Sequence, residues 1–428
     1  YAKRGKSKKS KKTEVSKDSS VKKESSKYKR TFKTKACETA KGDFLTLHWT
    51  KGKIYFEMPV KYLGREVLIA STISGASDTD LGMIGYKPKP PMHVKFVKMD
   101  SLICMSKVNV VPRYDEGDAA MKKAIGISTL DPILNTMPVF CYTPDSSAVV
   151  FDMTTLFTGS NDQLSPMSNG GGVVSVSGTF NSKASTVTGI KAFEDNASIK
   201  SYMSYSVSTK LMGLYTLSQN VPVTFQVTRT ILLLPEQKMR PRVSDSRIGI
   251  FNTNRLNFDK NEDFTYSMIH RWNLQPKDTA AYLRGELVEP VKPIVFYLDD
   301  AFPAAWAKGA RMGILRWNKA FEKIGFKNVI QILDFPKDDP NFDPDNLKYS
   351  CIRYVPARVM NAMGPSWVDP STGEIINASV LVYHDVVKLL NQWRFVQTAQ
   401  VDERARCKKM DEDMVTESIA YILAHEVG

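Results

Sequence analysis

The chain has 428 residues, of which 42% are hydrophobic and 24% are charged, and its formal net charge is +14. This length allows about three domains, and the hydrophobic content is enough to build folded cores. No run approaches 18 apolar residues, which excludes a membrane-spanning helix of ordinary length. The five cysteines stand without C-x-x-C pairing, which argues against a zinc ribbon or a disulfide framework.

The positive charge is concentrated at the start of the chain. Residues 1–36 hold 15 Lys and Arg residues against three acidic residues, so the remainder is nearly neutral. This Lys/Ser-rich segment has almost nothing to bury, which predicts a disordered tail. Two interpretations of the tail stay open: a solvated spacer, or a segment that contacts nucleic acid or another polyanion through its charge.

Residues 37–91 predict a small β-rich domain. Apolar side chains alternate with polar ones on both sides of the turn sequence at 50–53, at Leu45, Leu47 and Trp49 and again at Ile54, Phe56 and Met58. This alternation is typical of a β-hairpin. Residues 66–73 predict another strand, and residues 78–91 form a loop rich in Gly and Pro.

Residues 92–290 predict a larger β-rich domain of unknown function. Its predicted strands are rich in β-branched and aromatic residues and lie at 93–99, 101–105, 147–157, 201–209, 221–234 and 264–272. Three consecutive glycines at 170–172 predict a flexible loop, since no Lys-Ser/Thr follows them as a phosphate-binding loop requires. We find no repeat and no catalytic constellation in this part of the sequence.

In residues 291–428 the predicted elements are strands that alternate with helices, whereas the preceding part of the chain predicts strands alone. A strand is predicted at 294–298, after which Pro303 opens a long helix that ends at Gly325. The two tryptophans of that helix, Trp306 and Trp317, are interpreted as core anchors. Further strands are predicted at 329–333, 352–355 and 375–382.

Four histidines lie outside the end of the chain. We interpret His48 as a surface or cross-strand residue and not as a ligand. His93 and His270 stand in strand-like runs without nearby partner ligands, and we interpret both as structural. His384 and Asp385 follow the strand at 375–382. We interpret them as a surface pair at a strand end, with a metal ligand and its orienting carboxylate as the alternative.

The last predicted element is an amphipathic helix over 414–428, with Asp411 and Asp413 suited to its start. It ends in His425-Glu426-Val427-Gly428, the beginning of the zinc-protease motif H-E-x-x-H. In that motif two histidines one helical turn apart ligate one Zn²⁺, and the glutamate is the general base for the attacking water. Four residues alone also suit a helix end that carries two polar side chains, so the motif needs further support.

Three stretches of the last third supply that support. They are the run 317–322 (WNKAFE) followed by Gly325-Phe326, the turn 369–375 (DPSTGEI) and the ending 424–428 (AHEVG). Together with the order of the elements, they resemble a family of large bacterial cell-envelope zinc metalloproteases with a metzincin-like catalytic domain. The resemblance covers roughly residues 40–428, and over 40–290 it rests on domain order and on the stretch 239–243 (MRPRV).

This resemblance implies an α+β fold, in which β-rich N-terminal and middle regions precede the upper half of a metzincin-like domain at 291–428. It implies a zinc-dependent metalloendopeptidase, with His425 as the first zinc ligand, Glu426 as the general base and Gly428 as the residue before the second ligand. It also implies a peptide or protein substrate that pairs with the strand edge at 378–382. We expect no specific nucleic acid partner, and a location outside the cell or in the cell envelope.

The other ligands of that family would follow Gly428, so we expect the sequence to be a fragment of a longer protein. Because one imidazole does not hold zinc as three ligands do, we expect the chain as given to bind no catalytic zinc and to be inactive. The alternative, from another class, is a β-domain binding or adhesion protein whose protease-like module is degenerate.

Overall fold

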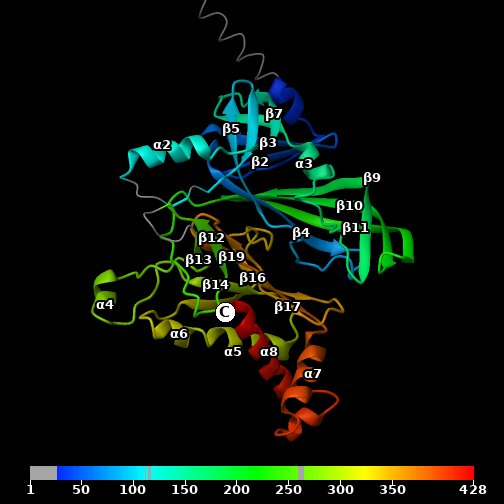
Figure 1. Ribbon diagram of the computed structural model, residues 1–428, viewed down its shortest axis with the longest axis vertical. Coiled ribbons are helices and arrows are strands. Elements are labelled where there is room, and N and C mark those ends of the chain that lie inside the picture. The colour runs from blue at the N-terminus through cyan, green and yellow to red at the C-terminus, as the bar shows by residue number, and fades with distance from the viewer. Residues whose placement is uncertain (1–26, 111, 114–116, 259–264) are drawn as a thin grey trace, which may run out of the picture. The chain divides into compact units, whose positions relative to one another are not determined.

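The computed structural model describes residues 27–110, 112–113, 117–258 and 265–428, and the chain forms two compact units (Figure 1). Unit 1 comprises residues 1–109 and 130–234, and unit 2 comprises residues 110–129 and 235–428. Strands make up 41% of the described residues and helices 20%, which agrees with the α+β class in its coarse form. None of the helices in the described part of the chain reaches the length and apolar character needed to span a bilayer.

Unit 1 is built on an eleven-stranded antiparallel sheet with the strand order β1-β2-β3-β8-β7-β6-β5-β4-β11-β10-β9. In chain order the strands β1 to β11 are Cys37–Ala40, Thr46–Thr50, Lys53–Pro59, Glu66–Ala76, Met92–Met99, Leu102–Lys107, Ile133–Tyr142, Ala148–Asp152, Val174–Ala192, Asn196–Leu211 and Tyr215–Leu233. Short helices accompany them, η1 at Val60–Tyr62, α3 at Thr154–Thr158 and a helical segment at 27–32.

The sheet of unit 1 curls so far that its two end strands, β1 and β9, lie near each other. Its inner face carries the main core, which includes the fully buried rings of Phe44, Phe56, Phe96, Phe151 and Phe157. Rings of this size contribute most of the buried apolar area of such a core. The alternation of apolar and polar residues in the sequence therefore corresponds to an inner and an outer face of one sheet.

The hairpin predicted at the start of unit 1 is confirmed. β2 and β3 pair in the register Leu47↔Phe56 and Thr50↔Lys53. The two turn residues, Lys51 and Gly52, have φ angles of 50° and 73°. Positive φ at both central residues defines the turn whose twist matches that of antiparallel strands, so the Lys-Gly sequence fixes the register.

The expected N-terminal tail is structured in its last part. Residues 27–32 are helical, and Tyr28 and Phe32 are buried in a small cluster with Tyr55, Cys141 and Val150. The prediction that residues 1–36 are disordered is therefore wrong for 27–36, because two aromatic side chains supply the apolar area that the Lys/Ser composition hides. Residues 1–26 lie outside the described residues.

The expected boundary at residue 91 divides one continuous sheet. β4, before that boundary, pairs with β11 and with β5, which both lie after it. The expected strand at 147–157 is β8 followed by α3, and β9 was not predicted at all. β9 is rich in Ser, Thr and Gly, so its sequence lacks the apolar alternation that marks the other strands.

Unit 2 contains a five-stranded sheet with the order β15-β14-β16-β20-β17, in which β17 is antiparallel to β20 and the other pairs are parallel. The strands β14 to β17 and β20 are Ile294–Leu298, Ile330–Asp334, Ser350–Val355, Ala362–Met363 and Val380–Tyr383. Two small antiparallel sheets pair β12 (Asn252–Leu256) with β13 (Thr265–Ile269), and β18 (Ser366–Val368) with β19 (Ile375–Ala378).

The helices of unit 2 are α2, α4, α5, α6, α7, η2 and α8, at Ala119–Ser128, Thr279–Leu283, Ala304–Leu315, Asn318–Glu322, Val386–Thr398, Glu403–Arg406 and Glu412–Val427. α5 and α8 pack closely together. Phe296, Ile314, Ile352, Val382 and Leu423 are nearly or fully inaccessible in the core that the sheet and helices share. Parallel strands joined by helices bury both faces of such a sheet, which explains the nearly continuous apolar run at 294–298.

The division between the two compact units falls at residue 235, whereas the predicted domain boundary lies at 290. Two other sequence expectations for unit 2 need correction. The long helix expected from Pro303 to Gly325 is two helices, because 3₁₀-type hydrogen bonds from Trp317 N to Ile314 O and from Lys319 N to Arg316 O tighten the chain between α5 and α6. The strand expected at 375–382 is split into β19 and β20, which belong to different sheets.

Candidate functional site

The predicted last helix is present as α8, and its start is capped as the sequence suggests. The Asp411 side chain accepts a hydrogen bond from the Met414 amide at 2.8 Å. Glu412 and Asp413 place negative charge in the first turn, where the helix dipole favours it. The cap and the first turn therefore fix where α8 begins, and with it the turn on which His425 and Glu426 lie.

Two glycines of α5 let it approach α8 more closely than ordinary helices do. A Cβ atom on Gly309 would lie 2.5 Å from the Thr416 carbonyl oxygen, and a Cβ atom on Gly313 would lie 2.8 Å from two backbone atoms of Ala420. The Thr416 hydroxyl also donates to the Ala305 carbonyl at 3.3 Å. Glycines four residues apart on one helix face thus hold α8 backbone to backbone against α5.

The C-terminal end of α8 is held from two further sides. The Trp317 indole N–H donates to the Ala424 carbonyl oxygen at 2.7 Å, which satisfies one of the carbonyls that a helix end leaves unpaired. On another side Gly364 touches the backbone of Glu426, since a Cβ atom there would lie 3.2 Å from the Glu426 carbonyl carbon and closer still to its oxygen. Trp317 and Gly364 therefore fix the turn that carries the candidate residues.

His425 and Glu426 lie on this turn in different environments. The His425 side chain is exposed and has no hydrogen bond to another described residue, whereas Glu426 is half-buried. Burial raises the pKa of the Glu426 carboxyl, and the charge of His425 and the Gly364 amide oppose this only in part. A half-buried carboxyl with a raised pKa beside an accessible imidazole can accept a proton from a group bound at the helix end.

The donor set for a metal is incomplete among the residues that the structure describes. No group of three or more His, Cys, Asp or Glu side chains there is placed to hold a metal ion. A catalytic zinc site takes three protein ligands, and this helix end offers one imidazole. The described residues alone therefore do not make a zinc site, and the assignment of His425 and Glu426 stays a prediction.

The antiparallel strand β17 ends the sheet beside α8. β20 pairs with β16 on one side, and its residues Leu381 and Val382 pair with β17 on the other. The continuous free strand edge expected at 378–382 is therefore wrong. β17 is instead the last strand of the sheet, and it leads directly into Gly364. The strand edge nearest to Glu426 is therefore that of Ala362–Met363.

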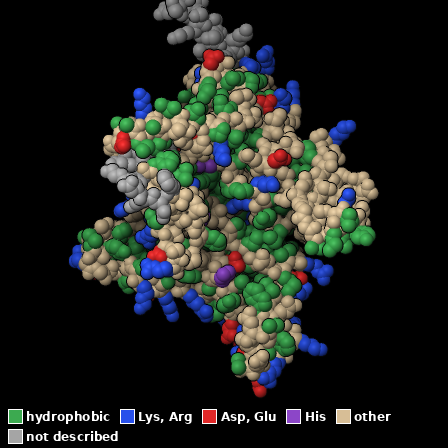
Figure 2. Space-filling model, in the orientation of Figure 1, with side chains coloured by type: hydrophobic (Ala, Val, Ile, Leu, Met, Phe, Trp, Pro, Cys, Tyr) green, Lys and Arg blue, Asp and Glu red, His purple; other side chains and the backbone are tan. Residues whose placement is uncertain are grey.

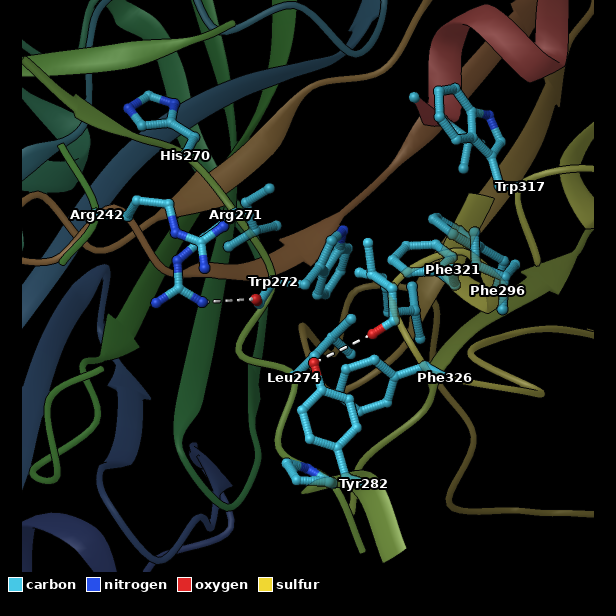
Figure 3. Close-up of a pocket in the computed structure, with 17 residues that line it drawn as sticks. Arg242, His270, Arg271, Trp272, Leu274, Tyr282, Phe296, Trp317, Phe321 and Phe326 are labelled. Carbon is cyan, nitrogen blue, oxygen red and sulfur yellow. Dashed lines mark hydrogen bonds between the residues drawn. The ribbon is translucent and has the colours of Figure 1, made fainter. Parts of the chain in front are cut away.

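A cavity of about 610 Å³ opens at the end of α8, where Val427 and Gly428 form part of its wall. Figure 3 shows aromatic rings converging on it, namely Trp272, Tyr282, Phe296, Phe321 and Phe326. Trp317 lies at one end of the group, and Arg242, His270 and Arg271 lie at the other. His425 and Glu426 do not line the cavity, so it is a neighbour of the candidate residues and not their pocket.

The arginine end of this cavity is partly desolvated. Burial lowers the pKa of Arg271, and the neighbouring charge of Arg242 lowers it further. One Arg271 N–H donates to the Arg240 carbonyl at 2.6 Å, while its buried Nε has no partner among the described residues. Burial also lowers the pKa of His270, which favours its neutral form. The cavity therefore combines an apolar body with a cationic end.

Each of the four other histidines is hydrogen-bonded to a neighbouring side chain. His48 is buried and shares hydrogen bonds with Thr39 and Glu57, and the others share one each with Glu66, Thr253 or Tyr354, at His93, His270 and His384. Asp385 pairs with Lys388 at 2.7 Å and has no hydrogen bond to His384. These contacts agree with a structural role for His93 and His270 and with a cross-strand role for His48, which stands opposite Thr39. His384 is exposed but Asp385 is buried, so the expected surface pair is wrong for Asp385.

Sequence reasoning missed the residues that position the helix end. Gly309 and Gly313 stand four apart within a helical pattern, and this spacing is a signal of close helix packing that we did not use. Trp317 was expected in the core, but it is half-buried and acts as a hydrogen-bond donor. Gly364 was noted only as part of a turn.

Two family models match parts of the chain. The model for Domain of unknown function (DUF5118) matches residues 25–76, and the model for Domain of unknown function (DUF5117) matches residues 87–277. No curated protein and no solved structure matches the chain. The DUF5118 match includes the segment at 27–36, in which Tyr28 and Phe32 are buried.

Proposed function

We propose that the end of α8 serves peptide-bond hydrolysis in a zinc-dependent metalloendopeptidase, with a metzincin-like arrangement of residues 291–428. His425 would be one zinc ligand and Glu426 the general base. Zinc, when bound, would polarise the scissile carbonyl and lower the pKa of water. This proposal includes a peptide or protein substrate and a location outside the cell or in the cell envelope.

The observation that carries this proposal is the turn with His425 and Glu426. An accessible imidazole stands next to a half-buried carboxyl whose pKa burial raises. A general base works best when its pKa is close to the working pH, and a raised carboxyl pKa moves in that direction. Trp317 and Gly364 restrain the same turn, so the carboxyl is held in place before a substrate arrives.

The arrangement around the turn supports the same proposal. A short antiparallel strand, β17, ends an otherwise parallel sheet and leads into the glycine that touches Glu426. An extended peptide can add to such a strand edge through main-chain hydrogen bonds. The chain would then contribute an edge for the substrate, a base for the reaction and one metal ligand.

The alternative is a β-domain binding or adhesion protein whose protease-like module is degenerate. The incomplete donor set among the described residues is consistent with both proposals. The gene sequence after the Gly428 codon separates the two proposals. A histidine at position 429 and a further ligand six residues later support the hydrolase, and non-ligand residues at both positions support the binding protein.

The biochemical test uses two chains. The purified 428-residue chain should hold no stoichiometric zinc and cleave no peptide, since it offers one imidazole at this place. If the gene supplies the other ligands, the longer chain should hold one zinc and show chelator-sensitive peptidase activity. In that chain Glu426→Gln should lower kcat by about 10²- to 10⁴-fold and keep the metal.

A matched control lies on the same helix. Glu417 is exposed, and its carboxylate lies 3.8 Å and 3.9 Å from guanidinium nitrogens of Arg394 and Arg404. Glu417→Gln removes the same charge from α8 but should leave peptidase activity unchanged. Full activity of Glu426→Gln, or an equal loss in Glu417→Gln, would overturn the role given to Glu426.

A further inference from the structure

Three strands of unit 1 extend beyond the rest of their sheet as an arm. β11 pairs with β4 only from Phe225 onward, and its earlier part pairs with β10 alone. β10 in turn pairs with β9 down to Leu211↔Val174. We call residues 173–181 and 206–223 the arm. It extends about 30 Å past β4, given the rise per residue of a strand.

The end of the arm is apolar and exposed. Six of its side chains, all apolar or aromatic, are between 48% and 80% exposed: Val173, Val174, Met212, Leu214, Tyr215 and Leu217. Figure 2 shows hydrophobic side chains gathered over the end of β9, β10 and β11 on the right of the view. Single exposed apolar side chains are ordinary on protein surfaces, whereas a contiguous group marks an interaction site.

Strand pairing places part of this group on one face. Leu211 stands opposite Val174 on β9 and opposite Tyr215 on β11, and directly opposed residues of antiparallel strands point to the same face. Further along the arm Val207 stands opposite Gly178 and Val221. Between these two positions Thr209 stands opposite Val176 and Ser218 and shares a hydrogen bond with Ser218, so one polar pair separates the apolar end of the arm from the core of unit 1.

The turn between β10 and β11 exposes an apolar residue at a strained position. Met212 and Gly213 have φ angles of 48° and 71°, and the Leu214 amide donates to the Leu211 carbonyl at 3.0 Å. Asn or Asp is the usual residue before Gly in this turn, because a side chain such as Met tolerates positive φ poorly. Folding stability alone does not account for a methionine here.

The charge of the arm distinguishes between possible partners. Within 173–181 and 206–223 one side chain is charged, Lys210, although 24% of the whole chain is charged. No Asp or Glu occurs anywhere in 163–193 or 196–235. A carboxylate would be repelled by anionic lipid headgroups and is costly to desolvate, whereas Ser, Thr and a lysine suit a headgroup layer.

We propose that the end of this arm inserts into the surface of a lipid bilayer. Met212, Leu214 and Tyr215 enter the boundary between headgroups and acyl chains, and Lys210 stays among the headgroups. A protruding apolar tip suits a bilayer, which needs no complementary groove, and tyrosine is enriched at this boundary in membrane proteins. This attachment is independent of the chemistry proposed for α8.

The test is cosedimentation of the full 428-residue chain with vesicles of phosphatidylcholine alone and of phosphatidylcholine mixed with phosphatidylglycerol. It is run in about 0.5 M NaCl, which suppresses binding through the basic N-terminal segment. The native chain should bind both vesicles. Met212→Asn/Leu214→Ser should bind roughly a hundredfold more weakly, since each buried side chain of this size contributes about a tenfold gain.

The variant is chosen to fold. Asn at position 212 gives the preferred Asn-Gly turn, so its urea midpoint should equal or exceed that of the native chain. Ile133→Ser is the matched control, because Ile133 lies on β7 of the same unit and is 52% exposed; its vesicle binding should be unchanged.

Three results would overturn the proposal. They are a native chain that stays in the supernatant with both vesicles, a double variant that sediments as the native chain does, and a native dimer that the double variant abolishes without any vesicle binding. The last result would assign the tip to a second copy of this chain.

Discussion

The substitution Gly313→Ala tests the close contact between α5 and α8. The new Cβ atom would lie 2.8 Å from the Cα and the carbonyl carbon of Ala420, and closer still to its oxygen, whereas ordinary contacts are 3.4 Å or longer. The obstacle is the backbone of α8, which has no alternative rotamer. The two helices must therefore separate by at least about 0.6 Å, and the core between them loses contacts.

Two opposing effects determine how much Gly313→Ala changes the free energy of unfolding. Alanine is a better helix former than glycine by about 1 kcal/mol, which favours the variant. Overpacking against a rigid neighbour destabilises by about 1–3 kcal/mol and occasionally more. Because Gly313 meets backbone and not a flexible side chain, we place the steric term at the upper end. The expected net result is a destabilisation of about 2 kcal/mol.

A matched control occurs in the same unit. Gly126 lies in α2, also in a helical conformation, and a Cβ atom there would meet nothing within 4 Å. Gly126→Ala should therefore stabilise by about 1 kcal/mol through helix propensity alone. Urea unfolding followed by tryptophan fluorescence reports mainly on unit 2, since five of the six tryptophans lie there and only Trp49 lies in unit 1.

The two variants should shift the urea midpoint in opposite directions. Gly313→Ala should lower the urea midpoint and Gly126→Ala should raise it. If Gly313→Ala were as stable as the native chain or more stable, the close approach of α5 and α8 would be wrong, and the positioning of His425 and Glu426 by this contact would fail with it.

Two further predictions concern pH. Burial alone would raise the pKa of Glu57, but hydrogen bonds from His48 at 2.8 Å and Tyr28 at 2.6 Å outweigh it, and the pKa falls below its ordinary value of 4.5. The ionised carboxylate therefore stabilises the fold above pH 4.5, and this stabilisation is lost as the pH falls through the pKa of Glu57 in the folded protein. In Glu57→Gln the urea midpoint should therefore fall less at acidic pH than it does in the native chain. An equal fall in both chains would contradict this prediction. Burial raises the pKa of Glu426 above 4.5, so its contribution to stability is present below pH 4.5 and is lost as the pH rises through the folded-state value. Glu426→Gln should therefore raise the urea midpoint at pH 7 and give no gain at pH 4, and a lower midpoint at pH 7 would refute the raised pKa.

The sequence predicted correctly those elements whose ends are determined by capping, turn or proline residues next to them in the chain. β14 was predicted residue for residue, because a short apolar run lies between Pro293 and the acidic pair at 299–300. α8 was predicted because Asp411 caps it, and the β2–β3 hairpin because a Lys-Gly turn separates two alternating runs. In each case the residues that decide the structure are adjacent in sequence.

Elements decided by distant contacts were missed. β9 forms because β10 offers it a partner along its length, although its own Ser/Thr-rich sequence gives no apolar alternation. The break between α5 and α6 coincides with the residue whose indole reaches the Ala424 carbonyl, more than a hundred residues away. The contact between Gly364 and Glu426 is likewise long-range, so the sequence predicted Glu426 as a candidate base but not the contact that restrains it.

The path of the chain between the two units restricts how this protein can be divided. Residues 110–129 belong to unit 2 although they are flanked on both sides by unit 1, and Arg113 pairs with Asn257 and bonds to Leu256 and Phe258. The chain therefore passes from one unit to the other three times, at 109–110, 129–130 and 234–235. A truncation or a gene fusion made with a single cut at residue 234 would separate Arg113 from its partners. The two units are therefore best exchanged or expressed together.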